Sequence, residues 1–169
     1  MTDRRFFDTS ALVKRYAEEP GTETVDRLIE SPDATVYVTS IAVVEMTSAF
    51  RRKHSRGECT EETMLDLLSA FYEDALQEYV VLPVDETLFE WSVDLILEDD
   101  LRTLDSLQLA AALALAAEVE NVQFVCADRR LVETARSRGL NGVDPSELPA
   151  CAVGLHRYRV PPSLPSPVV

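Results

Sequence analysis

Short runs of β-forming residues alternate along the chain with longer stretches of helical periodicity, and this alternation restricts the possible folds more than any other feature. The β-rich runs lie at 4–7, 35–39, 79–84 and 122–127, with a candidate short strand at 141–145. Helical patterns cover about 10–17, 22–30, 40–54, 61–78, 86–98, 103–118 and 129–138. Strands separated by helices pair in parallel through right-handed crossovers. The sequence therefore predicts an α/β fold, a parallel β-sheet flanked by helices.

The chain divides into one domain and a tail. Its 169 residues, 46% of them hydrophobic, are enough for one well-cored domain, which we expect to span 1–148. From residue 149 the chain is rich in proline and contains no acidic residue. We expect 149–169 to be extended or disordered outside the core.

The overall charge and composition exclude several classes of protein. A net charge of −14 argues against a general nucleic-acid coat, although it leaves room for a nuclease with a local basic rim. The most apolar stretch, "LQLAAALALAA", is too short to cross a bilayer, so we expect no membrane partner. Three widely spaced cysteines fit reduced thiols in the cytoplasm and disfavour a zinc site.

Two aspartates directly follow predicted strands. Asp8 follows the first strand and Asp128 follows the fourth. Because binding sites of parallel sheets lie beyond the carboxyl ends of the strands, both side chains are expected at the same edge of the sheet. Taken singly, each also fits an ordinary helix cap, as Asp85 does.

Two further acids lie on helix faces where a carboxylate is costly. Glu45 falls one turn from Ile41 and Ala49, on a face expected to be half-buried, in a helix for which Ser40 is the predicted N-cap. Asp105 flanks an almost entirely apolar helix. An aspartate at the start of a helix also suits the helix dipole. Asp105 taken alone therefore fits a structural role as well as a place in a site.

If the four acids converge, the repulsion between their negative charges must be offset. Four carboxylates about 6 Å apart form six repulsive pairs of about 2.8 kcal/mol each at an effective dielectric of 20. Their sum, roughly 17 kcal/mol, exceeds the stability of a typical domain, about 5–15 kcal/mol. Such a cluster must take up protons or bind cations, and oxygen ligands without histidine or cysteine suit Mg²⁺ or Mn²⁺.

The motif series "FFDTSALVKRY", "SIAVVEMTSAFRRK", "LRTLDSLQLAAAL" and "FVCADRRLVETARSRGL" resembles the PIN domain. More narrowly, it is similar to the VapC-type ribonuclease toxins of bacterial and archaeal toxin–antitoxin pairs. The resemblance runs from about residue 5 to 148. It implies a single domain with a Rossmann-like parallel sheet whose acids gather at one edge. It also implies Mg²⁺- or Mn²⁺-dependent cleavage of RNA, a homodimer and a small antitoxin partner.

The resemblance also implies the site residues. The metal-binding and catalytic acids would be Asp8, Glu45, Asp105 and Asp128. The hydroxyl of Ser10, with that of Thr9 as the alternative, would lie beside the first acid.

The chain departs from its relatives at two positions near these acids. Cys126 stands where relatives often carry threonine or serine, so a hydroxyl that could orient substrate or a metal-bound water is lost. Gln108 stands where histidine is frequent.

Basic residues adjoin three of the four acids along the sequence and are candidates for phosphate contacts. They are Lys14, Arg15, Arg51, Arg52, Lys53, Arg56, Arg129 and Arg130. The cluster at 51–56 fits a helix C-terminus equally well, because cations there suit the helix dipole. The apolar face of the helix at 61–78 is mainly core, with part of it a candidate surface for dimerisation or antitoxin binding.

Three other functions compete with the toxin interpretation. One is a PIN-domain nuclease of RNA processing, or one acting on DNA, without an antitoxin. Another is a PIN-fold binding module whose catalytic site has decayed. A nucleotide-binding Rossmann protein is disfavoured, because no glycine-rich phosphate loop follows the first strand.

Overall fold

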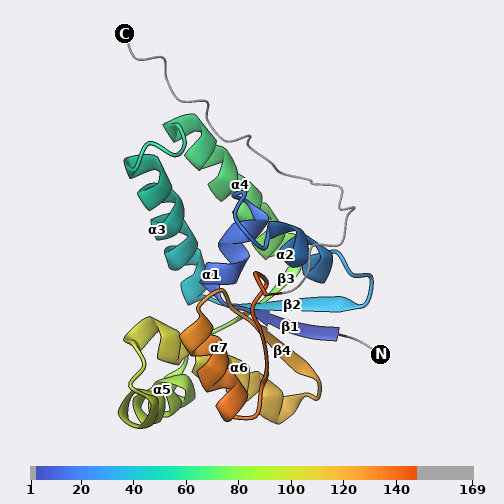
Figure 1. The fold of residues 1–169 in the computed structure, drawn as a ribbon, viewed down its shortest axis with the longest axis vertical. Coiled ribbons are helices and arrows are strands. Elements are labelled where there is room, and N and C mark those ends of the chain that lie inside the picture. The colour runs from blue at the N-terminus through green and yellow to red at the C-terminus, as the bar shows by residue number, and fades with distance from the viewer. Residues whose placement is uncertain (1–2, 148–169) are drawn as a thin grey trace.

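Five parallel strands form one sheet at the centre of the molecule (Figure 1). The computed structural model describes residues 3–147. The strands are β1 (Asp3–Phe7), β2 (Ala34–Thr39), β3 (Tyr79–Leu82), β4 (Val122–Val125) and β5 (Asn141–Val143). Their order in the sheet is β3-β2-β1-β4-β5, and every neighbouring pair is parallel. The predicted α/β class is confirmed, and β1 is the central strand.

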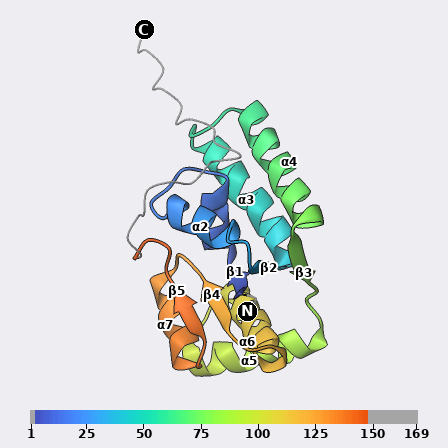
Figure 2. The ribbon, with the colours of Figure 1, turned by 90° about the vertical axis from the view of Figure 1, so that its right-hand side faces the viewer.

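Helices cover both faces of this sheet (Figures 1 and 2). One layer contains α1 (Thr9–Leu12), the 3₁₀ turn η1 (Val13–Arg15), α2 (Thr22–Ile29), α3 (Ile41–Ser55) and α4 (Glu61–Gln77). The other contains α5 (Glu86–Asp99), α6 (Thr103–Glu118) and α7 (Arg129–Ser137). In Figure 1, α3 and α4 project side by side away from the sheet.

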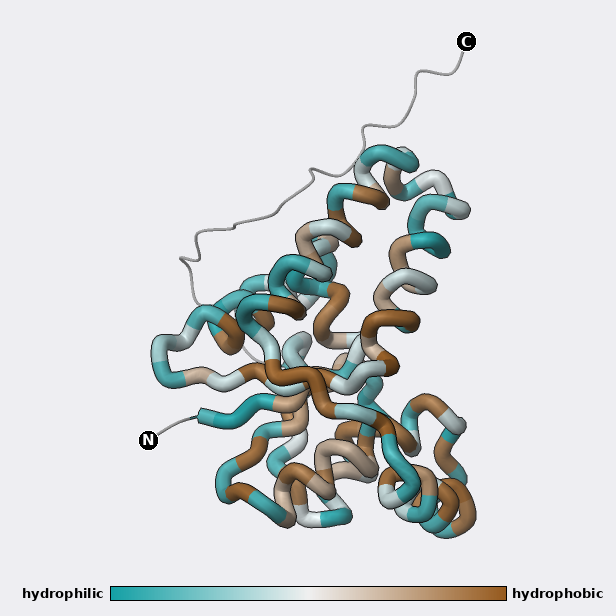
Figure 3. The backbone as a smooth tube through the Cα atoms, turned by 180° about the vertical axis from the view of Figure 1, so that it is seen from behind, coloured by the Kyte–Doolittle hydropathy of each residue, from teal (hydrophilic) through white to brown (hydrophobic). Residues whose placement is uncertain are grey.

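The alternation of side chains along the strands explains the two layers. Phe7 belongs to the apolar core under α1–α4, whereas its neighbour Phe6 belongs to the core under α5–α7. Val125 and Phe124 of β4 divide between the two cores in the same way. Figure 3 shows the result as a hydrophobic band through the middle of the molecule.

Two local predictions were wrong in detail. The helix expected at 10–17 is instead the short α1 followed by η1, in which the Tyr16 amide donates to the Val13 carbonyl three residues back. Ser40 precedes α3 but makes no capping hydrogen bond. Its backbone is already helical, and its amide donates to the Leu82 carbonyl at 2.8 Å.

The expected tail at 149–169 lies outside the described residues. Within 3–147, no helix combines the length and the apolar character needed to cross a membrane.

Candidate active site

The carboxyl ends of β1 and β4 bring Asp8 and Asp128 to the same edge of the sheet, as the sequence predicts. The Asp8 amide donates to the Val125 carbonyl at 2.9 Å, which joins the two strand ends. Each aspartate also caps the helix that follows it: Asp8 accepts from the Ser10 amide at 3.0 Å, and Asp128 accepts from the Leu131 amide at 3.2 Å. The capping role and a place at the site therefore coincide.

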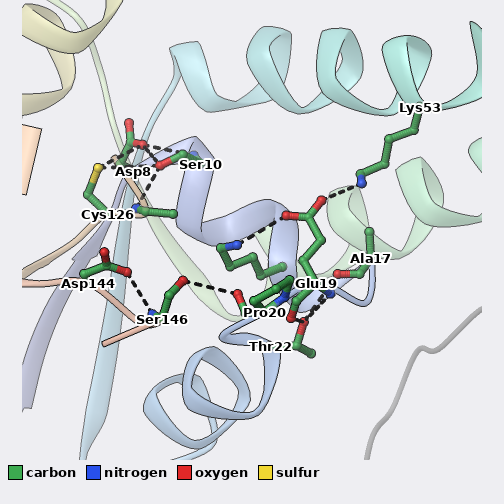
Figure 4. Close-up of polar contacts among 12 residues, drawn as sticks. Asp8, Ser10, Ala17, Glu19, Pro20, Thr22, Lys53, Cys126, Asp144 and Ser146 are labelled. Atoms are coloured by element: carbon green, nitrogen blue, oxygen red, sulfur yellow. Dashed lines mark hydrogen bonds and ion pairs between the residues drawn. The ribbon is translucent and has the colours of Figure 1, made fainter. Parts of the chain in front are cut away.

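Ser10 and Cys126 connect these two strand ends (Figure 4). The Ser10 hydroxyl donates to Asp8 Oδ2 and accepts from the Ala127 amide at 3.0 Å. The Cys126 thiol is fully buried, donates to Asp8 Oδ2 at 3.5 Å and accepts from the Asp128 amide at 3.3 Å. Burial and the adjacent Asp8 carboxylate raise the pKa of Cys126, so the thiol stays protonated and can keep donating to Asp8.

A cavity of about 390 Å³ lies beside this edge, and three of the four predicted acids line it: Asp8, Glu45 and Asp105. A smaller pocket of about 100 Å³ is lined by Asp105 and Asp128 together with Arg102 and Arg130. Asp105 borders both spaces. The structure thus brings the four acids to two adjoining pockets at the carboxyl edge of the sheet.

The Glu45 carboxylate is held by side chains from two other helices. Its Oε2 atom accepts from the Thr9 hydroxyl at 2.7 Å and from the Gln108 amide at 2.6 Å. Gln108 also donates to Thr9 Oγ1 at 3.3 Å and accepts from the Thr39 hydroxyl at 3.1 Å. The carboxylate of α3 is therefore held by side chains from α1 and α6, and β2 joins the network through Gln108.

The electrostatics of the site disfavour charge on two of the acids. Burial raises the pKa of Asp8 to about 6, the Ser10 hydrogen bonds oppose this rise, and the negative charge of Glu45 adds to it. The pKa of Asp105 is also raised, first by burial and then by the charge of Asp128. These mutual effects are what close carboxylates produce in the absence of a compensating cation.

The donor chemistry fits a hard divalent cation. Within residues 3–147, no three His, Cys, Asp or Glu side chains are grouped closely enough to hold a metal ion between them. Mg²⁺ does not require such a cage, because it commonly binds one or two carboxylates and retains several waters. Carboxylates that line one cavity and repel one another suit this mode of binding.

Some of the basic residues predicted to contact phosphate are buried in the fold. The prediction was wrong for Lys14 and Arg15. Lys14 and Arg15 are buried and paired with acids, Lys14 with Glu19 and Arg15 with Asp26, so they are not available to phosphate. The reason is that Glu19, which follows η1 in the chain, and Asp26 of α2 form ion pairs with the two side chains.

Arg52 is the basic residue of α3 that lines the cavity, alongside Glu45. Lys53 instead pairs with Glu19 (Figure 4) and also with Glu58. Arg102, which sequence reasoning missed, borders the smaller pocket with Arg130. Its position three residues before Asp105 was the available signal.

The comparisons with known proteins agree with this architecture. Residues 5–137 match the PIN domain family. The solved structure of FitAcB from Neisseria gonorrhoeae is similar, with a TM-score of 0.57, 15% identity, and coverage of 85% of this chain and 99% of that one. VapBC-1 from nontypeable Haemophilus influenzae is similar with a TM-score of 0.53, the same identity and the same coverage. A comparison with curated proteins gives no match.

Proposed function

Because the chain belongs to the PIN domain family, we propose that it is a Mg²⁺- or Mn²⁺-dependent endoribonuclease. We further propose that it is the toxin of a type II toxin–antitoxin pair, inhibited by a small antitoxin protein and acting as a homodimer in the cytoplasm. Its catalytic and metal-binding residues would be Asp8, Glu45, Asp105 and Asp128, assisted by Ser10.

One observation carries the proposal: acids from four separate segments of the chain border two adjoining pockets at the carboxyl edge of the sheet. Helix capping by Asp8 and Asp128 does not account for the whole group, since burial and neighbouring carboxylates disfavour the charge on Asp8 and Asp105. The raised pKa values of Asp8 and Asp105 express that cost. Cation binding would offset this cost and would explain why the acids lie together.

The residues of the site would divide three tasks of RNA hydrolysis between them: cation binding, orientation of Asp8 and phosphate binding. The carboxylates of Asp8, Glu45, Asp105 and Asp128 would hold the divalent cation directly or through water. When bound, this cation activates water and neutralises charge that develops on the phosphodiester. Ser10 orients the Asp8 carboxylate through its amide and hydroxyl. Arg52, at the cavity wall, would bind a substrate phosphate.

The test is RNA cleavage by an Asp8→Asn variant in Mg²⁺ or Mn²⁺, compared with Asp85→Asn. Asp85 also caps a helix, accepting from the Leu88 amide at 3.1 Å, but it does not line the acidic cavity. D8N should lose about 100-fold or more in rate, because it removes a charged ligand. D85N should retain cleavage. Undiminished cleavage by D8N, or equal losses in both variants, would exclude the proposed site.

The antitoxin is supported by the VapC-like motifs, and one of the similar solved structures is VapBC-1. Its test is purification of the chain together with the product of any short neighbouring reading frame. A toxin should co-purify with a small protein and cleave RNA only after that protein is removed.

Full activity without any such partner would favour the alternative of a nuclease of RNA processing. Equal or preferred cleavage of DNA would favour the DNA-acting alternative, and a chain inert toward both nucleic acids in either metal would favour the decayed binding module.

A further inference from the structure

Gln108 stands out among the buried polar side chains because its amide nitrogen donates to Glu45, a carboxylate of the candidate site, and to Thr9, which donates to the same carboxylate oxygen. Its side chain is 1% exposed, yet its partners are the side chains of Glu45, Thr9 and Thr39 rather than backbone groups. A buried amide that served only the core could be satisfied by any nearby carbonyl or amide of the main chain. This amide instead connects β2 to the cavity wall.

The charge on Glu45 fixes which way the amide faces. The Thr39 hydroxyl donates to Gln108 Oε1 at 3.1 Å, and the amide nitrogen then faces Glu45 Oε2 at 2.6 Å. The opposite orientation would place the amide oxygen against the carboxylate oxygen, where both atoms are acceptors. The network therefore has one orientation, with a donor directed at Glu45.

Thr9 closes the network on the other side. Its hydroxyl accepts from Gln108 at 3.3 Å and donates to the same Glu45 oxygen at 2.7 Å. Two donors thus hold Oε2 of Glu45. No residue within 3–147 donates a hydrogen bond to the second oxygen, Oε1, so that oxygen is available to a cation or a water in the cavity that Glu45 lines.

We propose that Gln108 is a positioning residue for Glu45: its amide, oriented by Thr39, holds one carboxylate oxygen so that the other serves the cation site. This inference rests on the proposed function, because it assumes that Glu45 contributes to cation binding. Partners that orient a metal ligand change metal affinity by about 10- to 100-fold when they are removed. Gln108 should affect cation affinity without touching the cation.

The experiment measures Mn²⁺ binding calorimetrically in the absence of RNA, so that its readout does not depend on catalysis. Gln108→Met keeps the length of the side chain and removes both donors, and it should weaken Mn²⁺ binding about tenfold. Gln108→Glu keeps the shape but opposes Glu45 with a second carboxylate, and it should weaken binding at least as much. Unchanged affinity in both variants would overturn the proposal.

Tyr79→Phe is the matched control for loss of a buried hydrogen bond. The Tyr79 hydroxyl lies 2.9 Å from that of Tyr16, in a polar cluster away from the acidic cavity. Y79F should lower thermal stability yet leave Mn²⁺ affinity within about twofold of the wild type. If Y79F weakened Mn²⁺ binding as much as Q108M does, the effect of Q108M would be one of general stability and the proposal would fail.

A double-mutant cycle with Glu45→Gln tests whether Gln108 acts through Glu45. In the E45Q background, Q108M should change Mn²⁺ affinity by less than about twofold, because the charge that it orients is gone. Additive losses would show that Gln108 acts otherwise, and would overturn the inference while leaving the proposed function intact. A wild-type chain that binds no Mn²⁺ would remove the proposed cation site and this inference together. Mn²⁺ binding by E45Q as tight as that of the wild type would remove Glu45 as a ligand and overturn this inference, while leaving the site formed by the other acids.

Thr39→Val decides the question if neither Gln108 variant folds. It leaves Gln108 in place and removes only the hydrogen bond that orients the amide. Weaker Mn²⁺ binding by T39V, with native thermal unfolding, supports the positioning role. Unchanged binding by T39V overturns it.

Discussion

The Asp8 carboxyl group combines two roles that sequence reasoning treats as alternatives. It caps α1 by accepting from Ser10, and it lines the cavity of about 390 Å³ together with Glu45 and Asp105. Capping requires an acceptor at the first turn, and the candidate site requires an anion at the strand end. Because β1 leads directly into α1, one side chain meets both requirements. Asp128 has the same pair of roles at the start of α7.

The raised pKa of Asp8 predicts how the stability of the metal-free protein depends on pH. Its pKa is about 6 in the folded chain against an ordinary value of 3.8, so the folded state binds the proton more tightly than the unfolded state does. The free energy of unfolding should therefore fall as pH rises from about 4 to 6, by up to about 1.4 kcal/mol per pH unit from this group. Above about pH 6 the whole cost, on the order of 3 kcal/mol, is present.

Replacement by asparagine removes this titration while retaining an oxygen that can cap α1. D8N in EDTA should be more stable than the wild type by about 1–3 kcal/mol at pH 7.5, and this advantage should shrink toward pH 5. Urea denaturation of both proteins at several pH values measures the difference. A D8N variant that is less stable than the wild type at pH 7.5, with a pH-independent difference, would contradict the assignment.

At the scale of elements, a buried polar cluster joins η1, α4 and β3. The Tyr16 hydroxyl donates to Asp74 Oδ2 at 2.8 Å and lies 2.9 Å from the Tyr79 hydroxyl. The Tyr16 ring also packs edge-on against Phe50 and Phe71. Tyr16 thus packs against both α3 and α4 and connects this pair to the segment that follows η1.

Tyr16→Phe should therefore cost more stability than Tyr79→Phe. Loss of the Tyr16 hydroxyl leaves the buried Asp74 carboxylate without that donor, at a cost of about 1–3 kcal/mol. Y79F leaves the Tyr16–Asp74 bond intact and should cost about 1 kcal/mol or less. Thermal unfolding of the two variants gives the ranking, and a larger loss in Y79F would contradict it. Neither change should affect RNA cleavage per folded molecule.

The elements were more predictable from the sequence than the contacts between them. Periodicity identified the five strands and most of the helices, because it reflects which faces are buried. The strand-end rule was sufficient to bring Asp8 and Asp128 to one edge. The burial of Lys14 and Arg15 was not predictable, since it depends on η1 replacing a helical turn and on where Glu19 and Asp26 lie in space.

The same limit applies to the partners of Glu45. Gln108 and Thr39 lie far from Glu45 in sequence, and only the packing of α6 and β2 against α3 brings them together. Sequence reasoning identified Gln108 as a departure from related sequences without assigning it a partner. Residue identity indicated the chemistry of the acids, whereas the geometry that orients them depends on tertiary structure.

At the scale of the whole molecule, the proposed substrate and the protein repel each other. The chain carries a net charge of −14, and RNA is a polyanion. Salt screens such long-range repulsion over about 10 Å at 0.1 M, so binding must depend on short-range contacts near the cavity. Arg52 lines that cavity, while its sequence neighbour Arg51 is exposed on the same helix and does not.

This pair allows the local contact to be separated from the global charge. Arg52→Glu and Arg51→Glu each replace a charge of +1 by −1, so each takes the net charge from −14 to −16. In a D8N background, in which cleavage should be slowed about 100-fold or more, R52E should weaken RNA binding about tenfold and reduce the salt dependence by about one phosphate contact. R51E should change the affinity by about twofold or less at 0.1 M salt, because its charge is screened. Filter binding or fluorescence anisotropy over a salt series measures both. Equal losses in the two variants would mean that RNA responds to the overall field of the protein, and Arg52 would then have no specific part in holding the substrate at the acids.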